Sequence, residues 1–496
     1  MLASIRNTTT APPPPTISLA GDTWNAIDPA LSPQEATPSS VSEGISTQLV
    51  SSLQRWNDLA VAIQCQGPSL ALESIARQCL DLFFEYLYPL TPLVHEPSLR
   101  AALEFFIAQR GVVETLRQHT APSTVPSLWT SQAHRSPGGN EALDSASSLA
   151  HPELWPEPNF TLITAVCAES AFLLPKEVFP EGYLVANTFL QASRDCLQSY
   201  LEVDLENPIE SSVAIRYFHS NCLHAAGKPK FSWHIFGEAV RLAQVMQLHD
   251  ESSHEGLFPM EAELRRRAFW IVYLGDKSAA LLNNRPITIH KFSFESGITT
   301  SYPSGAGEET PLSPGWIETP TATRPAEPPS LIVGFNANIQ LWQSASDLLL
   351  ELRLIEYMKA DGSSTQHRLS EEERHRIDSL YVRFATCLDS LPPYLQPDSL
   401  LSHGEQTGLR RQFSIQSTNL QVTYHCLRMV ITQRFEEIDY FKPDLESADM
   451  LILRKTDIAR DMLRIIRGAP FWALQVNGEP CVCHKTNLSP EFNICN

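Results

Sequence analysis

The stretch from Phe231 to Pro286 constrains the fold of this chain most strongly, because its pattern predicts two amphipathic helices joined by a polar loop. The first helix is expected to begin near Ser232, since serine is a favoured residue at a helix N-cap. Its apolar residues then recur at helical spacing: Ile235, Ala239, Leu242, Ala243 and Met246. The stretch therefore predicts a helical hairpin with a broad apolar face.

The second helix of the hairpin begins with a charged turn and then becomes apolar. Glu261 and Arg265 are four residues apart, as are Glu263 and Arg267, so each pair can meet on the helix surface. The helix is expected to end before Pro286, which cannot continue it.

Length and composition are those of a globular protein. The chain has 496 residues, of which 43% are hydrophobic and 19% charged, and no run approaches the roughly 18 apolar residues of a membrane span. The N-terminus has no apolar core of signal-peptide length, and the ten cysteines are widely spaced, which favours reduced thiols inside the cell. A net charge of −19 argues against extended nucleic-acid binding by this chain alone.

The rest of the chain predicts an all-α fold, a large multi-helix domain over 46–470 with long surface loops at about 120–157 and 297–330. Residues 1–45, rich in Pro, Ser and Thr, predict a disordered leader, and 471–496 predict an irregular tail. Besides the hairpin, we predict helices at 41–63, 70–88, 97–119, 159–174, 180–203, 207–225, 334–359, 370–390, 409–436 and 446–468.

Motifs for catalysis are missing from the sequence. It has no P-loop, dinucleotide-binding glycine pattern, GxSxG elbow or HExxH. His249 and His254 could in principle bind a metal ion, but polar residues in a solvated turn are the preferred interpretation. Cys481, Cys483 and His484 do not have the spacing of a standard zinc knuckle. We therefore predict no catalytic, cofactor-binding or metal-binding residues, and not an enzyme.

Two charged features of the hairpin have competing interpretations. The basic run Arg265 to Arg267 could contact nucleic acid or form part of a nuclear import signal. A salt-bridge network is preferred, since two glutamates precede the run. Asp276 lies among apolar residues, where a carboxylate needs a partner, and Arg285 is the predicted one. We treat this pair, together with Arg266, as internal structural locks.

The hairpin also resembles the central domain of fungal-specific transcription factors, often called the middle homology region. In that family this domain follows a binuclear zinc cluster of six cysteines. The residues that match the family pattern form a structural signature: Trp233, Gly237, Leu248, His249, Glu263, Arg265, Arg266, Phe269, Trp270, Asp276, Arg285 and Pro286. Further matches are Phe83 to Leu99 and the Leu391-Pro392-Pro393 turn, so the resemblance covers about residues 70–470.

The resemblance implies a nuclear regulator of RNA polymerase II transcription that controls a metabolic or secondary-metabolite gene set through a helical regulatory domain. The partners that it implies are promoter DNA, through a missing or partner-supplied module, and transcription co-regulators. It also allows a homodimer and a small-molecule effector, with no membrane.

The sequence departs from the family in two ways that keep alternatives open. The six-cysteine cluster is absent, since no cysteine precedes Cys65, so zinc is expected only if an N-terminal cluster exists elsewhere. Asn284 also replaces the family's glycine before the Arg-Pro pair. One alternative is a regulator without its own DNA-binding domain that acts through a partner protein. An enzyme of unknown class is the other.

Overall fold

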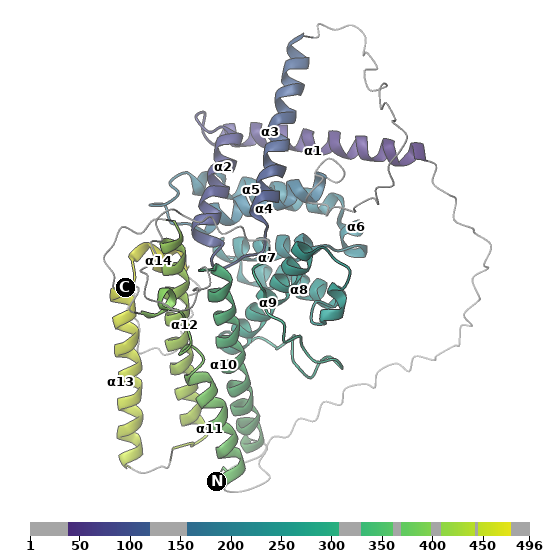
Figure 1. The fold of residues 1–496 in the computed structure, drawn as a ribbon. Helices are drawn as coiled ribbons and strands as arrows, with labels where there is room; N and C mark the ends of the chain where they lie inside the picture. The colour runs from purple at the N-terminus through teal and green to yellow at the C-terminus, as the bar shows by residue number, and fades with distance from the viewer. Residues whose placement is uncertain are drawn as a thin grey trace, which may run out of the picture. The chain divides into compact units, whose positions relative to one another are not determined.

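The computed structural model describes residues 38–119, 156–306, 329–360, 369–397, 408–441 and 445–477. The chain divides into two compact units, Met1–Gly44 and Ile45–Asn496, and every contact described below lies within the second. All regular elements in the described residues are helices, which confirms the all-α prediction (Figure 1).

The α-helices follow one another in this order: α1 (Pro38–Gln66), α2 (Leu72–Leu82), α3 (Glu96–His119), α4 (Pro156–Leu173), α5 (Gly182–Ser199), α6 (Leu201–Glu206), α7 (Glu210–Ala225), α8 (Pro229–Val245), α9 (Pro259–Leu282), α10 (Leu331–Ala360), α11 (Glu371–Ala385), α12 (Leu409–Glu437), α13 (Leu445–Gly468) and α14 (Phe471–Val476). Three short turns of other helix types complete the set: the π-helix η1 (Phe83–Leu87) and the 3-10 helices η2 (Glu251–His254) and η3 (Pro393–Leu395).

The core is built around α4, whose residues from Pro156 to Ala171 are all buried. This helix packs against α5 and α7, and a helix with apolar residues on every side is expected to lie in the interior. Its polar side chains find partners within the core. Thr164 donates to the carbonyl of Phe160 at 2.7 Å, and Ser170 donates to the carbonyl of Cys79 at 2.9 Å.

A second group of helices packs around α12, which contacts both α10 and α13 (Figure 1). Gly334 allows α10 to approach α12, because a Cβ atom there would lie 2.3 Å from the side-chain oxygen of Gln416. Gln416 donates to the carbonyls of Pro89 and Leu331 at 2.8 and 2.7 Å. The α10–α12 contact is therefore tied to the turn that follows η1.

Several predicted boundaries were wrong for local reasons. Helix α8 begins at Pro229, not at Ser232, since proline fixes φ and suits the first helical position. The predicted 180–203 helix is interrupted at Tyr200, where φ is −126°. Phe471 begins the short helix α14 inside the predicted irregular tail.

The predicted leader up to residue 37 and most of both predicted loops, at 120–155 and 307–328, lie outside the described residues. Residues 478–496, with Cys481, Cys483 and His484, lie outside them as well. None of the helices in the described part of the chain combines the length and apolarity that crossing a bilayer requires.

Candidate regulatory site

Helices α8 and α9 form the predicted hairpin, and a glycine sets how closely they pack. A Cβ atom on Gly275 of α9 would lie 2.5 Å from the ring of Phe236 on α8. The loop between the helices contains Gln247 with a φ of +54°, followed by the fully buried Leu248. The hairpin is therefore closely packed.

Asp276 on α9 is fully buried and accepts hydrogen bonds from the backbone beyond the hairpin. The amides of Thr288 and Ile289 donate to its carboxylate at 2.8 and 3.1 Å. The ammonium of Lys277 lies 3.0 Å from the same carboxylate and also donates to the carbonyl of Ile289. Burial lowers the pKa of Lys277, and the charge of Asp276 opposes that shift.

The predicted Asp276–Arg285 pair is wrong. Arg285 is exposed, and its guanidinium lies over the ring of Trp233 at 5.5 Å from the centroid. Asn284 has a φ of +52°, a conformation that glycine adopts at no steric cost. That turn carries Arg285 to the surface and returns the backbone amides after Pro286 to Asp276.

Glu263 forms a second buried carboxylate site. It lies near the start of α9, whereas Asp276 lies near the end of that helix. It pairs with Arg267 at 3.0 Å and accepts hydrogen bonds from the amides of Ser304 and Gly305 at 3.0 and 2.9 Å. Burial acts to raise the pKa of Glu263, but the charge of Arg267 and the two amides outweigh it and hold that pKa below its usual value. The carboxylate is therefore held ionised by its partners.

Residues 288–305, which we call the strap, lie along α9 in the opposite direction to the helix. Asp276 holds the start of the strap, and Glu263 holds its end. Between them, the indole of Trp270 donates to the carbonyl of Ser301 at 2.9 Å. Asn336 of α10 donates to the carbonyl of Pro303 at 2.8 Å, so the strap also joins α9 to α10.

Arg267 extends this network to the N-terminal helices. It is almost fully buried and donates to the hydroxyl of Tyr88 at 3.0 Å and to the carbonyl of Pro92 at 3.4 Å. We call Glu263, Arg267, Trp270, Asp276 and Lys277 the α9 clamp. The clamp connects three segments that are far apart in the sequence.

The basic run at the start of α9 forms ion pairs, which confirms the preferred prediction of a salt-bridge network. Arg265 pairs with Glu261 at 2.7 Å, and Arg266 pairs with Glu251 of η2. Arg267 pairs with Glu263 as described above. Each arginine of the run thus contacts a carboxylate.

The two histidines of the hairpin loop have different surroundings. His249 stacks on Phe294 of the strap with ring centroids 3.8 Å apart, and burial lowers its pKa. His254 is buried and lies 3.5 Å from Glu251, and burial lowers its pKa as well. Within the described ranges, no group of three His, Cys, Asp or Glu side chains could hold a metal ion.

The signature residues divide by exposure. Leu248, Glu263, Phe269, Trp270 and Asp276 are buried, and Arg265, Arg266 and His249 lie around the loop. Trp233, Gly237, Arg285 and Pro286 lie toward the outer side of α8 and its neighbouring turn. A Cβ atom on Gly237 would meet no atom within 4 Å, so packing does not require this glycine.

Sequence reasoning missed several residues that hold the site together: Tyr88, Gly275, Lys277, Ser304 and Gly305. Lys277 could have been found, because an acid and a base adjacent in an apolar helix suggest a buried pair. Glu263 accepts from the backbone amides of Ser304 and Gly305, for which the sequence has no side-chain signal, and from the hydroxyl of Ser304 at 3.0 Å.

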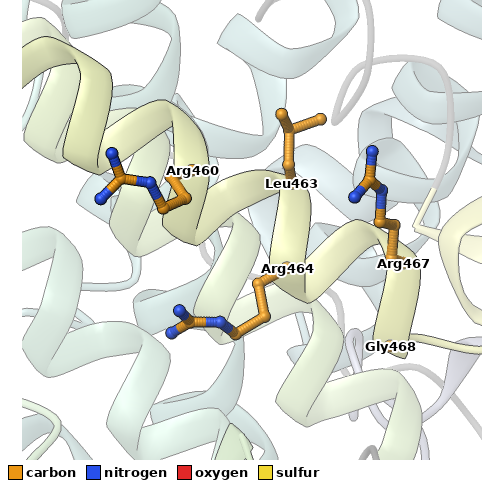
Figure 2. A pocket seen from close by; sticks show the side chains of 5 residues that line it. All are labelled: Arg460, Leu463, Arg464, Arg467 and Gly468. Atoms are coloured by element: carbon orange, nitrogen blue, oxygen red, sulfur yellow. The ribbon is translucent and has the colours of Figure 1, made fainter.

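Open hollows lie on the surface of the described residues, on α8 and on α13. One, of about 440 Å³, lies on α8 and is lined by Lys230, Trp233, His234, Gly237, Glu238 and Arg241. The other, of about 410 Å³, lies on α13, where Arg460, Arg464 and Arg467 project around Leu463 (Figure 2). Both are surface features and not enclosed cavities.

Together, the fold and this site define an all-helical domain in which one buried helix, α9, contacts segments distant in the sequence. Residues 211–386, from α7 to the end of α11, match the model of the fungal specific transcription factor domain. This part of the chain is therefore similar to the fungal specific transcription factor domain. The match includes the whole hairpin, the clamp and the strap.

The chain is also similar to curated fungal regulators. It is 28% identical over 205 residues to the aurofusarin cluster transcription factor aurR2 of Gibberella zeae. That alignment covers 41% of this chain and 25% of the relative. It is 22% identical over 267 residues to transcription factor FBD3 of Gibberella moniliformis (52% and 30%). It is 29% identical over 117 residues to the citrinin biosynthesis transcriptional activator mrl3 of Monascus ruber (21% and 22%).

The alignments thus span less than a third of the length of each of these relatives. No solved structure matches this chain.

Proposed function

We propose that this protein regulates RNA polymerase II transcription in the nucleus and controls a metabolic or secondary-metabolite gene set. The observation that carries the proposal is the domain match over 211–386, which falls on α7 to α11. Two relatives are named for aurofusarin and citrinin gene control, which supports the secondary-metabolite part. The proposal is of a regulator and not of an enzyme.

The α9 clamp is the element through which we propose that the domain changes state. Its carboxylates hold the strap by backbone amides, and Arg267 holds the turn at Tyr88 and Pro92. Releasing the strap would free α10 from α9 at Pro303 while leaving the α4 core intact. A co-regulator that binds only one of these two states would shift the balance between them.

A tethered reporter assay tests the proposal. The full chain is fused to an unrelated DNA-binding domain in a fungal host, and transcription is read from a promoter that carries the cognate site. We expect the fusion to change reporter output, and Glu263→Gln to alter that change by at least about threefold, because the strap amides lose the charged acceptor that holds them. An exposed carboxylate on the hairpin loop supplies the matched control, Glu255→Gln, which should behave as wild type.

Output equal to that of the DNA-binding domain alone, from a fusion shown to be folded and nuclear, would contradict the proposal. Output that changes with the fusion but not with Glu263→Gln would retain the transcriptional role and exclude the clamp as its switch.

A second candidate is a regulator that acts on transcription through a partner protein. The net charge of −19 favours it, because that charge opposes binding to phosphate backbones. An electrophoretic shift assay with this chain and promoter fragments separates the candidates. Specific DNA binding by the chain alone would exclude the partner-dependent one.

A small-molecule effector is a further part of the proposal. The α8 hollow combines the Trp233 ring with Lys230, Arg241 and Glu238, which suits a small planar metabolite that carries both an acidic and a basic group. Thermal unfolding of the purified chain with candidate pathway metabolites provides the test. If no metabolite raises the midpoint, effector binding is wrong while the transcriptional role is unaffected.

A further inference from the structure

Helix α13 carries large apolar side chains on its exposed side as well as on the face that packs against α12. It rests on α12 through Ile458 and Ile465, which are buried. Five other apolar side chains of the same helix are between 40% and 64% exposed: Met450, Ile452, Leu453, Leu463 and Ile466. Exposed apolar side chains gathered on one helix are typical of a site that contacts another molecule.

The outer face of α13 carries a heptad-like pattern. Its residues recur at alternating steps of four and three, which keeps them on one side of the helix. They are Asp449, Leu453, Thr456, Arg460, Leu463 and Arg467. Ile452, Ala459 and Ile466 run beside them at steps of seven. This outer face is therefore suited to contact with another helix.

The charges along this face decide which helix fits it. Asp449 lies near the start of α13, and Arg460, Arg464 and Arg467 lie near its end. Within the residues that the structure describes, Asp449 and Arg467 form no ion pair with each other or with a third group. A uniformly acidic or basic partner would leave one end of the face with like charges opposed.

A copy of the same helix in the opposite direction satisfies both ends. With a twofold axis at the level of residue 458, Asp449 lies opposite Arg467 of the second copy, and Leu453 lies opposite its Leu463. Thr456 then lies opposite Arg460 of the second copy, and Ile452 lies two residues out of register with its Ile466. Such self-complementarity is the hallmark of an isologous interface.

We propose that α13 is a homodimerisation surface that pairs with α13 of a second copy of this chain in antiparallel orientation. Asp457 approaches its own symmetry mate near the axis, and Arg460, 2.8 Å away on the same helix, compensates its charge. One helix pair is smaller than a standard interface of about 1,600 Å². The dimer should therefore form at roughly micromolar concentration.

Sedimentation velocity of the full chain over a concentration series tests this proposal. We expect a monomer–dimer equilibrium, and a rise in the dissociation constant of about tenfold for either Asp449→Arg or Arg467→Asp. The double variant Asp449→Arg/Arg467→Asp should restore the wild-type value, because the pair is exchanged across the axis. Arg410→Asp, an exposed charge reversal on α12, is the matched control and should change nothing.

A wild-type chain that stays monomeric up to about 100 µM overturns the proposal. So does a double variant that dissociates as readily as the single variants, because that result excludes the antiparallel register. Far-UV circular dichroism should be unchanged in all variants, since the substituted side chains are exposed.

A crosslinking experiment tests the register independently. In a Cys65→Ser background, Ala459→Cys places the two thiols of a dimer within one residue of the twofold axis on either side, and a short bismaleimide should join two chains. Val382→Cys, exposed on α11, should give no covalent dimer under the same conditions. Equal crosslinking of the two variants would contradict the proposed pairing.

Discussion

Helices α9 and α13 have the same length, 24 residues, and both carry acidic and basic side chains, yet they serve the fold differently. In α9 the charged groups Glu263, Arg267, Asp276 and Lys277 are buried and bind distant backbone. In α13 the ion pairs, such as Arg460–Asp457, lie in solvent. The comparison teaches that removing one partner of a charge pair should cost much more stability in α9, where the remaining charge stays buried, than in α13.

The largest expected difference between the two helices comes from removing one buried charge. Asp276→Asn leaves the ammonium of Lys277 buried without a charged partner and replaces two charge-assisted hydrogen bonds. We expect a loss of about 3–5 kcal/mol in the free energy of unfolding, measured by urea denaturation. The matched change on α13, Asp457→Asn, should cost less than about 1 kcal/mol. Equal losses in the two variants would contradict the comparison.

A buried carboxylate that has no cationic partner should make the free energy of unfolding depend on pH. Burial raises the pKa of Glu169 on α4 to about 8, and its neighbours are Asn221 and Cys222. The stability that its protonated form contributes is complete below the unfolded pKa near 4.5 and is lost as pH rises toward 8. The slope should reach about 1.4 kcal/mol per pH unit.

Glu169→Gln should remove this contribution, because the amide does not titrate. Comparing urea midpoints of the variant and wild type from pH 5 to about pH 8 gives the difference slope. Glu255→Gln, on the exposed loop, should leave the wild-type slope in place. A variant that parallels wild type across this range would show that Glu169 is ionised in the folded state.

Packing between the hairpin helices should produce an intermediate effect. Gly275→Ala places a methyl group 2.5 Å from Phe236, so we expect a net loss of about 1–2 kcal/mol despite the better helix propensity of alanine. Gly237→Ala, one helix away and facing open space, should gain up to about 1 kcal/mol. Thermal unfolding of both variants checks the pair, and a stabilised Gly275→Ala would mean that Phe236 moves aside freely.

The smallest effect on stability should come from the outer face of α13. Leu463→Ser removes an apolar side chain that is 46% exposed, so the free energy of unfolding of the monomer should change by less than about 0.5 kcal/mol. The same substitution should weaken self-association, because Leu463 faces Leu453 of the second copy. Urea denaturation at low protein concentration isolates the first effect, and a loss above about 2 kcal/mol would place Leu463 in the core.

Much of the fold was predictable because apolar spacing reports helix period directly. The predicted helix at 409–436 corresponds to α12, which spans Leu409–Glu437, and the predicted helix at 446–468 corresponds to α13. The prediction failed at the start of α8, which is Pro229, and at the break between α5 and α6, which is Tyr200. The hydrophobic pattern continues through both positions, and the local backbone conformation sets the boundary.

The site was predictable only where a side chain meets a side chain of the same helix. The Glu261–Arg265 and Glu263–Arg267 pairs follow from spacing and are confirmed. The partner of Asp276 was wrong, because its partners include backbone amides twelve and thirteen residues away. The apolar neighbours of Asp276 in the sequence predict that it needs partners. Which groups become its partners depends on the turn at Asn284, which brings the amides of Thr288 and Ile289 to the carboxylate.

Hydrogen–deuterium exchange tests the central claim that buried carboxylates on α9 hold the strap. In Glu263→Gln, peptides that cover residues 299–305 should exchange faster than in wild type, while peptides that cover 449–467 should not change. Glu255→Gln supplies the control and should match wild type throughout. Unchanged exchange at 299–305, or equal acceleration in both regions, would contradict the claim.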